Sequence, residues 1–299
     1  MEIRTVNYQY LQSNHTARRN SEIELMHLAF ADSGFFTLID HGLEEDVEKL
    51  FEFCSSFFDR AQSEKESVPR SDRYGYVPIT NRAIDRERKS GNAEFLDIGL
   101  SDEVKSAVID EYLNEIRSFQ SKGVAVALAL LRQLTHKIGV AENFFDQKMN
   151  DPQCRMRFLH YPRSSGSSDY PLKPHTDYGL ITLLATDGTP GLEIRQKDVG
   201  WVAIDPPEQS LVVNLGDMLA RWTNDRYNST PHRVRAPKEV SRYSIPFFIN
   251  PNPDTVIETI QTCVTERRPN MYDPVTAGNY LAARIDGDAE PYIRTEVPD

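Results

Sequence analysis

The sequence is poor in cysteine, in basic residues and in long apolar runs. Its three cysteines, Cys54, Cys154 and Cys263, lie far apart with no C-x-x-C pair, so neither a disulfide scaffold nor a zinc knuckle is expected. Lys and Arg number 34 against 45 Asp and Glu, which gives a net charge of -11 and excludes a general nucleic-acid binder. No apolar run is long enough to cross a bilayer, and the first residues do not resemble a signal peptide. These absences predict a cytoplasmic protein with no nucleic-acid or membrane partner, and they leave open a monomer or a weak homo-oligomer.

The length of 299 residues suits one large domain with a helical flank. We expect residues 1–150 to form a mostly helical region that packs on the core as part of the same structural unit. Residues 151–299 are expected to form that β core and a C-terminal helix.

The apolar pattern of the first half predicts helices around one early strand. The expected elements are an extended piece at 3–8, a helix capped by Asn20 or Ser21 and ended by Gly34, a strand at 35–39, a helix at 43–58, and a long helix from Val108 to Ile138 that bends near Gly123 and ends at Gly139. The long helix should cover one face of a sheet.

The second half changes to short β-rich runs separated by turn residues, which indicates an antiparallel sandwich or barrel. The expected strands are 154–161, 180–185, 192–196, 201–204, 211–215, 231–236 and 241–249. The fold class is therefore α+β with a mainly β core, flanked by helices that include one long backing helix.

A polar stretch from about Glu66 to Asn92 interrupts these patterns. It contains Tyr76 and the basic residues Arg82, Arg86, Arg88 and Lys89. A long polar loop in a compact domain is often functional, and a basic cluster in an acidic protein suits an anionic substrate. The alternative is an ordinary solvated surface loop.

A candidate metal site is formed by His175, Asp177 and His232. His175 and Asp177 are two residues apart in an extended run, so their side chains should point to the same side. With His232 from a distant strand they would supply two imidazoles and a carboxylate, the set associated with non-haem Fe(II) oxygenases. Taken singly, each residue could instead be an ordinary surface or core side chain.

Arg242 and Ser244 repeat the spacing of two on another predicted strand. A guanidinium beside a hydroxyl on one face is suited to binding a carboxylate at two points. The alternative role of Arg242 is a structural salt bridge.

The order His175-x-Asp177, His232, Arg242-x-Ser244 resembles the isopenicillin N synthase-like branch of the 2-oxoglutarate and Fe(II)-dependent dioxygenases. Flanking segments are similar to that family as well: Ser33-Gly34-Phe35-Phe36, Asp40-His41-Gly42, the run from Pro174 to Leu184, the run from Leu211 to Met218, and Trp222-Thr223-Asn224. The resemblance covers the chain from about Val6 to Arg284.

This resemblance implies a distorted double-stranded β-helix, or jelly roll, wrapped by helices. It implies that His175, Asp177 and His232 bind Fe(II), and that Arg242 and Ser244 bind the far carboxylate of 2-oxoglutarate. The reaction would hydroxylate an unactivated carbon of a metabolite, as in secondary metabolism, and release succinate and carbon dioxide, with ascorbate as an added reductant. An Asn and a Tyr that help to bind the cosubstrate in many relatives correspond here to Leu159 and Tyr161, so only Tyr161 can make that contact.

The sequence does not identify the substrate. Candidate substrate contacts are Tyr76, Arg82, Tyr178, Asn214 and Phe248. Two other functions stay open at this point: an oxidase of the same fold that does not use 2-oxoglutarate, and a metal- or ligand-sensing jelly-roll protein without turnover.

Overall fold

The computed structural model describes residues 3–71, 74–79, 93–100, 104, 106–163 and 170–286. Within these ranges the strands are β1 (Arg4–Asn7), β2 (Phe35–Ile39), β3 (Gly75–Val77), β4 (Glu94–Gly99), β5 (Cys154–Tyr161), β6 (Leu172–His175), β7 (Ile181–Thr186), β8 (Leu192–Gln196), β9 (Gly200–Ala203), β10 (Leu211–Leu215), β11 (His232–Val234), β12 (Arg242–Ile249), β13 (Val256–Ile257) and β14 (Val275–Thr276). The α-helices are α1 (Tyr8–Leu11), α2 (Thr16–Asp32), α3 (Glu44–Phe58), α4 (Gln62–Glu66), α5 (Ala107–Asp110), α6 (Leu113–Ile138), α7 (Asp217–Trp222) and α8 (Ala277–Asp286), and short 3-10 turns occupy Asp146–Lys148 and Gln261–Cys263.

Two sheets form the core of the molecule. The larger sheet has eight strands in the order β1-β2-β10-β7-β12-β5-β4-β3, and the smaller has four in the order β6-β11-β8-β9. All neighbouring strands are antiparallel except β1 and β2. Phe35 and Val212 of the large sheet share a buried cluster with Leu192 and Ile194 of the small one. The predicted α+β fold with a jelly-roll core is confirmed.

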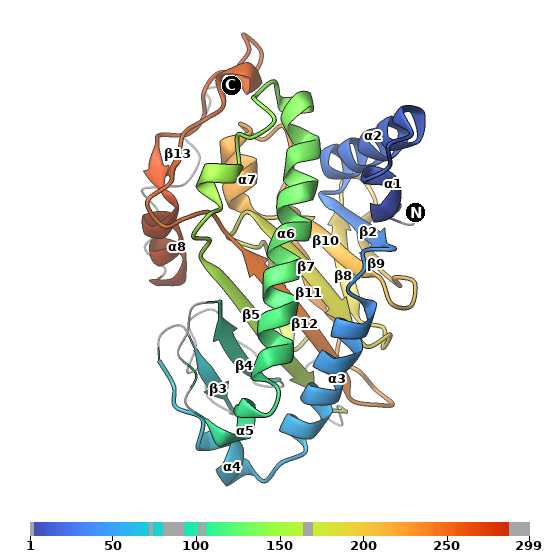
Figure 1. Ribbon diagram of the computed structural model, residues 1–299, viewed down its shortest axis with the longest axis vertical. Coiled ribbons are helices and arrows are strands. Elements are labelled where there is room, and N and C mark those ends of the chain that lie inside the picture. Colours follow the sequence, from blue (N-terminus) through green and yellow to red (C-terminus); the bar gives the residue numbers. More distant parts are fainter. Residues whose placement is uncertain are drawn as a thin grey trace.

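Helix α6 crosses one face of the large sheet along its length (Figure 1). Phe119 of α6 contacts Phe247 of β12, with ring centroids 6.0 Å apart. A Cβ at Gly123 would lie 3.0 Å from the Phe247 ring, so a glycine at this point lets the helix approach the sheet closely. Because strand side chains alternate, the residues adjacent to Phe247 point to the opposite face, where the candidate site lies.

The predicted helix boundaries are partly wrong. Helix α2 begins at Thr16, because the side chain of His15 accepts a hydrogen bond from the Arg18 backbone N–H and caps it, so neither Asn20 nor Ser21 is the cap. The long helix is interrupted at residues 111 and 112 and is continuous through Gly123. Gly139 ends it in the left-handed conformation, as predicted.

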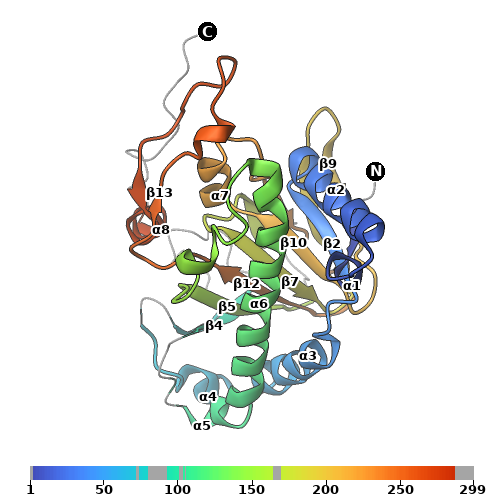
Figure 2. The same ribbon diagram turned by 45° about the horizontal axis from the view of Figure 1, so that its top comes forward.

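The seven strands predicted in the second half are present within one or two residues of their expected ends. Strands β3, β4 and β6 are not predicted by the sequence pattern, since they are short or lie beside the polar stretch. Strands β1 to β4 come from residues 1–150 and belong to the large sheet. Figure 2 shows two of them in place, β2 beside β10 and β4 beside β5. The division into a helical region at 1–150 and a core at 151–299 stays a prediction.

None of the helices in the described part of the chain is long and apolar enough to span a membrane. The three cysteines are free thiols and all are buried.

Candidate active site

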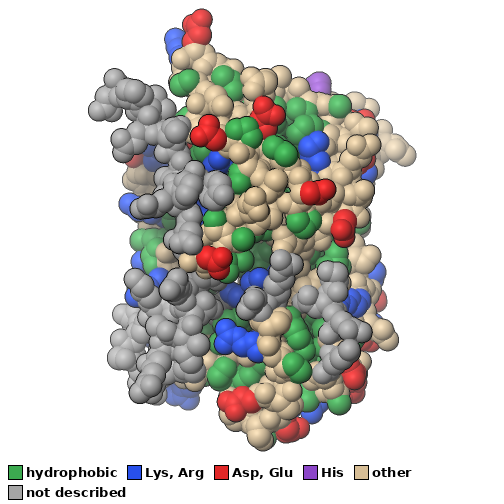
Figure 3. Space-filling model, turned by 90° about the vertical axis from the view of Figure 1, so that its left-hand side faces the viewer, with side chains coloured by type: hydrophobic (Ala, Val, Ile, Leu, Met, Phe, Trp, Pro, Cys, Tyr) green, Lys and Arg blue, Asp and Glu red, His purple; other side chains and the backbone are tan. Residues whose placement is uncertain are grey.

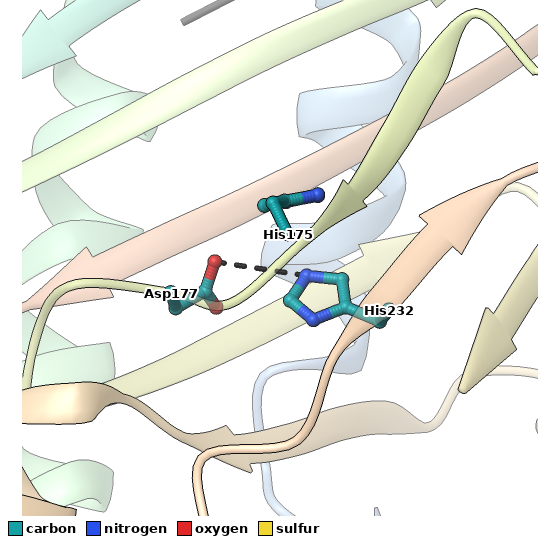
Figure 4. A group of neighbouring side chains, drawn as sticks. All are labelled: His175, Asp177 and His232. Atoms are coloured by element: carbon teal, nitrogen blue, oxygen red, sulfur yellow. Dashed lines mark ion pairs between the residues drawn. The ribbon is translucent and has the colours of Figure 1, made fainter. Parts of the chain in front are cut away.

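His175, Asp177 and His232 come together between the two sheets. His175 is the last residue of β6 and pairs directly with His232 of β11, and Asp177 follows two residues after the strand. Each of the three side chains offers one ligand atom, and these three atoms lie within 4.8 Å of one another. Figure 4 shows the three side chains converging on one point. The group could therefore hold a single metal ion.

The two imidazoles are oriented by their own backbone. Nδ1 of His175 lies 2.8 Å from the carbonyl oxygen of Lys173, and Nδ1 of His232 lies 3.2 Å from that of Thr230. A carbonyl oxygen can only accept, so each Nδ1 carries a proton and Nε2 is the ring nitrogen that could bind a metal. The edge of Phe35 packs against His232, with ring centroids 5.5 Å apart. Two rings held in this orientation, with Nε2 of His232 facing Asp177, are suited to Fe(II).

The carboxylate of Asp177 is held through one oxygen. Oδ2 accepts hydrogen bonds from Oγ1 of Thr182 and Nδ2 of Asn214, both at 2.7 Å, whereas Oδ1 lies 3.6 Å from Nε2 of His232. Burial alone would raise the pKa of Asp177, but the two imidazoles and the two hydrogen bonds outweigh it and lower that pKa. Asp177 is thus an ionised carboxylate with Oδ1 directed at the point where the ligand atoms meet.

A cavity of about 260 Å³ extends from this group across the inner face of the large sheet. Its wall includes Tyr161, Leu159 and Arg157 of β5, Arg242, Ser244 and Phe248 of β12, and Tyr178. The spacing of two thus brings Arg242 and Ser244 to the same wall. Of the predicted site residues, His175, Asp177, His232, Arg242, Ser244, Tyr161, Tyr178, Asn214 and Phe248 all line this cavity, and the binding role given to each stays a prediction.

Arg242 is a buried cation without a carboxylate partner in the described structure. It is 1% exposed, its Nε donates to the carbonyl oxygen of Thr189 at 3.1 Å, and its guanidinium lies 5.2 Å from the centroid of the Tyr161 ring. Neither Nη1 of Arg242 nor the buried hydroxyl of Tyr161 has a hydrogen-bond partner among the described residues. Buried charges and hydroxyls are normally paired, so these two groups fit an anionic ligand in the cavity.

Leu159 lies beside this pair and faces Ser244 in the strand register. It is 3% exposed and belongs to a small apolar cluster with Phe95, Tyr161 and Val234. The residue at the position of the Asn of many relatives therefore adds apolar surface to the cavity wall.

Among the described residues, one predicted substrate contact, Tyr76, does not line this cavity. Tyr76 pairs with Leu96 on the opposite face of the sheet, and its hydroxyl donates a hydrogen bond to Glu94. Arg82, together with the rest of the basic cluster, lies outside the described residues. His160 also points away from the cavity, where it stacks on Tyr243 with ring centroids 4.9 Å apart.

The sequence predicts Asn214 as a substrate contact, but its amide nitrogen is hydrogen-bonded to Asp177. Thr182, which makes the matching hydrogen bond, is not singled out by the sequence pattern. The signal lies in the pairing: Thr182 and Asn214 are direct partners in the register of β7 and β10, so both side chains point to the same face. Detecting it requires the strand pairing, which the sequence alone does not supply.

Helix α8 supplies another wall of the cavity through Leu281 and Ile285. Arg284 of the same helix forms an ion pair with Asp217 at 2.9 Å and lies over the Tyr178 ring, 4.3 Å from its centroid. The C-terminal helix expected within residues 151–299 is thus present, and it forms part of the cavity wall.

Known proteins resemble this chain over most of its length. Two family models match it, the 2OG-Fe(II) oxygenase superfamily over residues 150–251 and the non-haem dioxygenase in morphine synthesis N-terminal family over residues 3–121. Gibberellin 2-beta-dioxygenase 8 of Arabidopsis thaliana is 32% identical over 232 residues, which cover 75% of this chain and 67% of that protein. The chain belongs to the 2OG-Fe(II) oxygenase superfamily.

This 2-oxoglutarate-dependent dioxygenase is also similar to the 2-oxoglutarate-dependent dioxygenase citB of Monascus ruber, at 29% identity over 82% of this chain and 83% of that one. A full-length protein of Neurospora crassa, solved in complex with alpha-KG, matches with a TM-score of 0.85 and 25% identity over 95% of both chains. A 2OG-Fe(II) oxygenase family protein from Caulobacter crescentus matches with a TM-score of 0.85 and 27% identity over 96% of this chain and 99% of that one. Fe(II) and 2-oxoglutarate are the metal and the cosubstrate of this family, and the triad and the unpaired groups around Arg242 fit both.

Proposed function

We propose that the enzyme hydroxylates an unactivated C–H bond of a small-molecule metabolite or natural-product intermediate, with Fe(II) bound by His175, Asp177 and His232. In the overall reaction the substrate C–H group, dioxygen and 2-oxoglutarate give a C–OH group, succinate and carbon dioxide. The far carboxylate of 2-oxoglutarate binds to Arg242, Ser244 and Tyr161. The observation that carries this proposal is the buried Arg242 guanidinium, which has an unpaired Nη1 among the described residues and lies in the same cavity as the three candidate ligands.

The charge of Arg242 is the reason for placing the far carboxylate of 2-oxoglutarate at this residue. A guanidinium stays protonated at any working pH, and a buried cation without a counterion is unfavourable by several kcal/mol. The carboxylate of a ligand would neutralise it, and the hydroxyl of Tyr161 would donate to the same group. The relative solved with alpha-KG, which is 2-oxoglutarate under its older name, supports this assignment.

The bound Fe(II) would supply the activation of dioxygen, and the protein side chains would supply orientation and exclusion of water. Thr182 and Asn214 hold Oδ2 of Asp177 so that Oδ1 is presented to the metal. Leu159 and Phe248 make the cavity wall apolar beside the reacting groups. A C–H bond placed over the triad would therefore meet few water molecules that could compete for the oxidant.

The first experiment adds Fe(II) and then 2-oxoglutarate to metal-free protein under anaerobic conditions and records the visible spectrum. We expect the weak charge-transfer band of an Fe(II)-2-oxoglutarate chelate, which is lost in His175→Ala and in Asp177→Ala. Iron binding without this band would contradict the assignment of the cosubstrate and favour an oxidase that does not use 2-oxoglutarate.

The second experiment supplies oxygen and ascorbate with candidate substrates. Succinate should form in step with the hydroxylated product, and Asp177→Ala should form neither. Product without succinate would also favour the oxidase.

A further inference from the structure

A second, smaller cavity of about 80 Å³ adjoins the main one at the end of the sheet formed by β3, β4 and β5. The two cavities share Arg155, Arg157 and Ile285 as lining residues. The smaller one is also lined by Arg70 and Asp97. Figure 3 faces this side of the molecule, where Lys and Arg side chains gather around its lower centre. In a protein of net charge -11, this local excess of arginine calls for an explanation.

The one carboxylate among the described lining residues of the small cavity is already paired. Arg157 holds Asp97 through two hydrogen bonds, from Nε to Oδ1 at 2.5 Å and from its second nitrogen, Nη2, to Oδ2 at 2.7 Å. The Arg157 guanidinium also lies over the Phe95 ring, 4.2 Å from its centroid. Arg157 and Asp97 therefore neutralise each other and form a rigid wall.

Arg155 and Arg70 make up the excess charge. Nη1 of Arg155 lies 3.9 Å from Oδ2 of Asp97, which is too long for a hydrogen bond, and only 24% of the Arg155 side chain is exposed. Within the described ranges, neither Arg155 nor Arg70 has a side-chain hydrogen bond. A cation that is three-quarters buried and poorly paired would gain from an anion placed beside it.

The strand register fixes how far Arg155 lies from the candidate metal site. Thr182, Phe248 and Arg155 are direct partners on β7, β12 and β5, so they form one row across the inner face of the sheet. Thr182 holds Asp177, and Arg155 is two strands away, a distance of about 10 Å between backbones. A ligand that reaches from the triad to Arg155 would pass over Phe248.

The same register separates Arg155 from the proposed cosubstrate site. Arg155 faces Phe248, whereas Tyr161 faces Arg242 at the other end of the same two strands. Six residues of extended chain span about 20 Å. A 2-oxoglutarate molecule whose far carboxylate is bound to Arg242 therefore cannot also reach Arg155. The site at Arg155 is available to another ligand.

We propose that the substrate of this enzyme carries a carboxylate that binds to Arg155, assisted by Arg70, while the carbon to be oxidised lies over the triad about 10 Å away. One poorly paired, largely buried guanidinium matches the single charge of a carboxylate, which it can bind through two parallel N–H groups. This inference rests on the proposed function and narrows its substrate class to organic acids.

The test uses protein loaded anaerobically with Fe(II) and 2-oxoglutarate, so that Arg242 is already occupied. Phenylacetate, 4-phenylbutanoate and hexanoate are titrated against their primary amides, which have the same shape without the charge. Binding is measured by calorimetry and by perturbation of the chelate band. We expect at least one acid to bind about tenfold more tightly than its amide.

Arg155→Gln should remove this preference, and Arg70→Gln should reduce it. Arg195→Gln is the matched control, because Arg195 is exposed on β8 and lines neither cavity. A wild-type protein that binds no acid better than its amide, or a preference that survives Arg155→Gln, would overturn the inference. In either case an intact chelate band in the wild type and in Arg155→Gln leaves the proposed function standing, whereas a missing band in the wild type refutes that function itself.

Discussion

Replacing Asn214 with Ala is expected to weaken Fe(II) binding by about tenfold, without removing any proposed ligand. The amide nitrogen of Asn214 donates to Oδ2 of Asp177 at 2.7 Å, and Thr182 makes the second hydrogen bond to that oxygen at the same distance. Hydrogen bonds to a buried carboxylate contribute about 1.5–3 kcal/mol each. Mutating a residue that orients a metal ligand typically lowers metal affinity by about 10–100-fold.

The double variant Asn214→Ala, Thr182→Val sharpens this prediction. With both donors removed, the Asp177 carboxylate can rotate, and its Oδ2 is left buried without a hydrogen bond. The affinity for Fe(II) should therefore fall by about 100-fold, the upper end of the expected range. Metal affinity is measured by competition with a coloured chelator under anaerobic conditions, and the melting temperature is recorded in parallel.

Asn228→Ala is the matched control, because Asn228 is exposed and, among the described residues, its side chain donates only to the carbonyl oxygen of Ala31. It should leave metal affinity unchanged. A folded double variant with wild-type affinity for Fe(II) would refute the idea that these two residues orient the carboxylate.

Three further outcomes are expected. Arg242→Gln should raise the 2-oxoglutarate concentration needed for half-maximal turnover by more than about tenfold, measured as succinate formation, and an unchanged requirement would point to a different carboxylate site. Burial raises the pKa of Cys154 to about 12 and that of Cys54 well above its ordinary value, so iodoacetamide at pH 8 should label neither until the protein is unfolded; rapid labelling of native protein would contradict their burial. Burial would raise the pKa of Glu94, but hydrogen bonds from His160, Lys65 and Tyr76 outweigh it and lower that pKa. The ionised Glu94 therefore stabilises the fold above its ordinary pKa of about 4.3, and this stabilisation is lost as pH falls through the lowered value; the melting temperature should fall more steeply with acid in the wild type than in Glu94→Gln, and parallel curves would exclude this role.

The arrangement of the candidate site was predictable where a two-residue spacing sufficed. Arg242 and Ser244 line the same wall because alternate strand residues share a face. Asp177 lies two residues beyond the end of β6, and its carboxylate still comes close to His175. His232 was added as a third ligand from a distant predicted strand, and the family resemblance then added Tyr161. These predictions needed only local periodicity and the order of motifs along the chain.

Features that depend on long-range pairing could not be predicted. Tyr76 is a suitable substrate contact by its place in a polar stretch, but its register with Leu96 turns it to the helix-covered face. The role of Asn214 depends on its pairing with Thr182, and the charge of Arg155 becomes meaningful only because Asp97 is bound by Arg157. In each case a shift of one residue in register would reverse the direction of the side chain.

The burial of Arg242 has a kinetic consequence. Arg242 is 1% exposed, while Arg155 is partly exposed and Arg70 lies on the surface. An organic acid held at Arg155, with its reacting carbon over the triad, would occupy the cavity between the more exposed Arg155 and the buried Arg242. We therefore expect 2-oxoglutarate to bind before the organic acid, and a bound organic acid to slow the dissociation of unreacted 2-oxoglutarate.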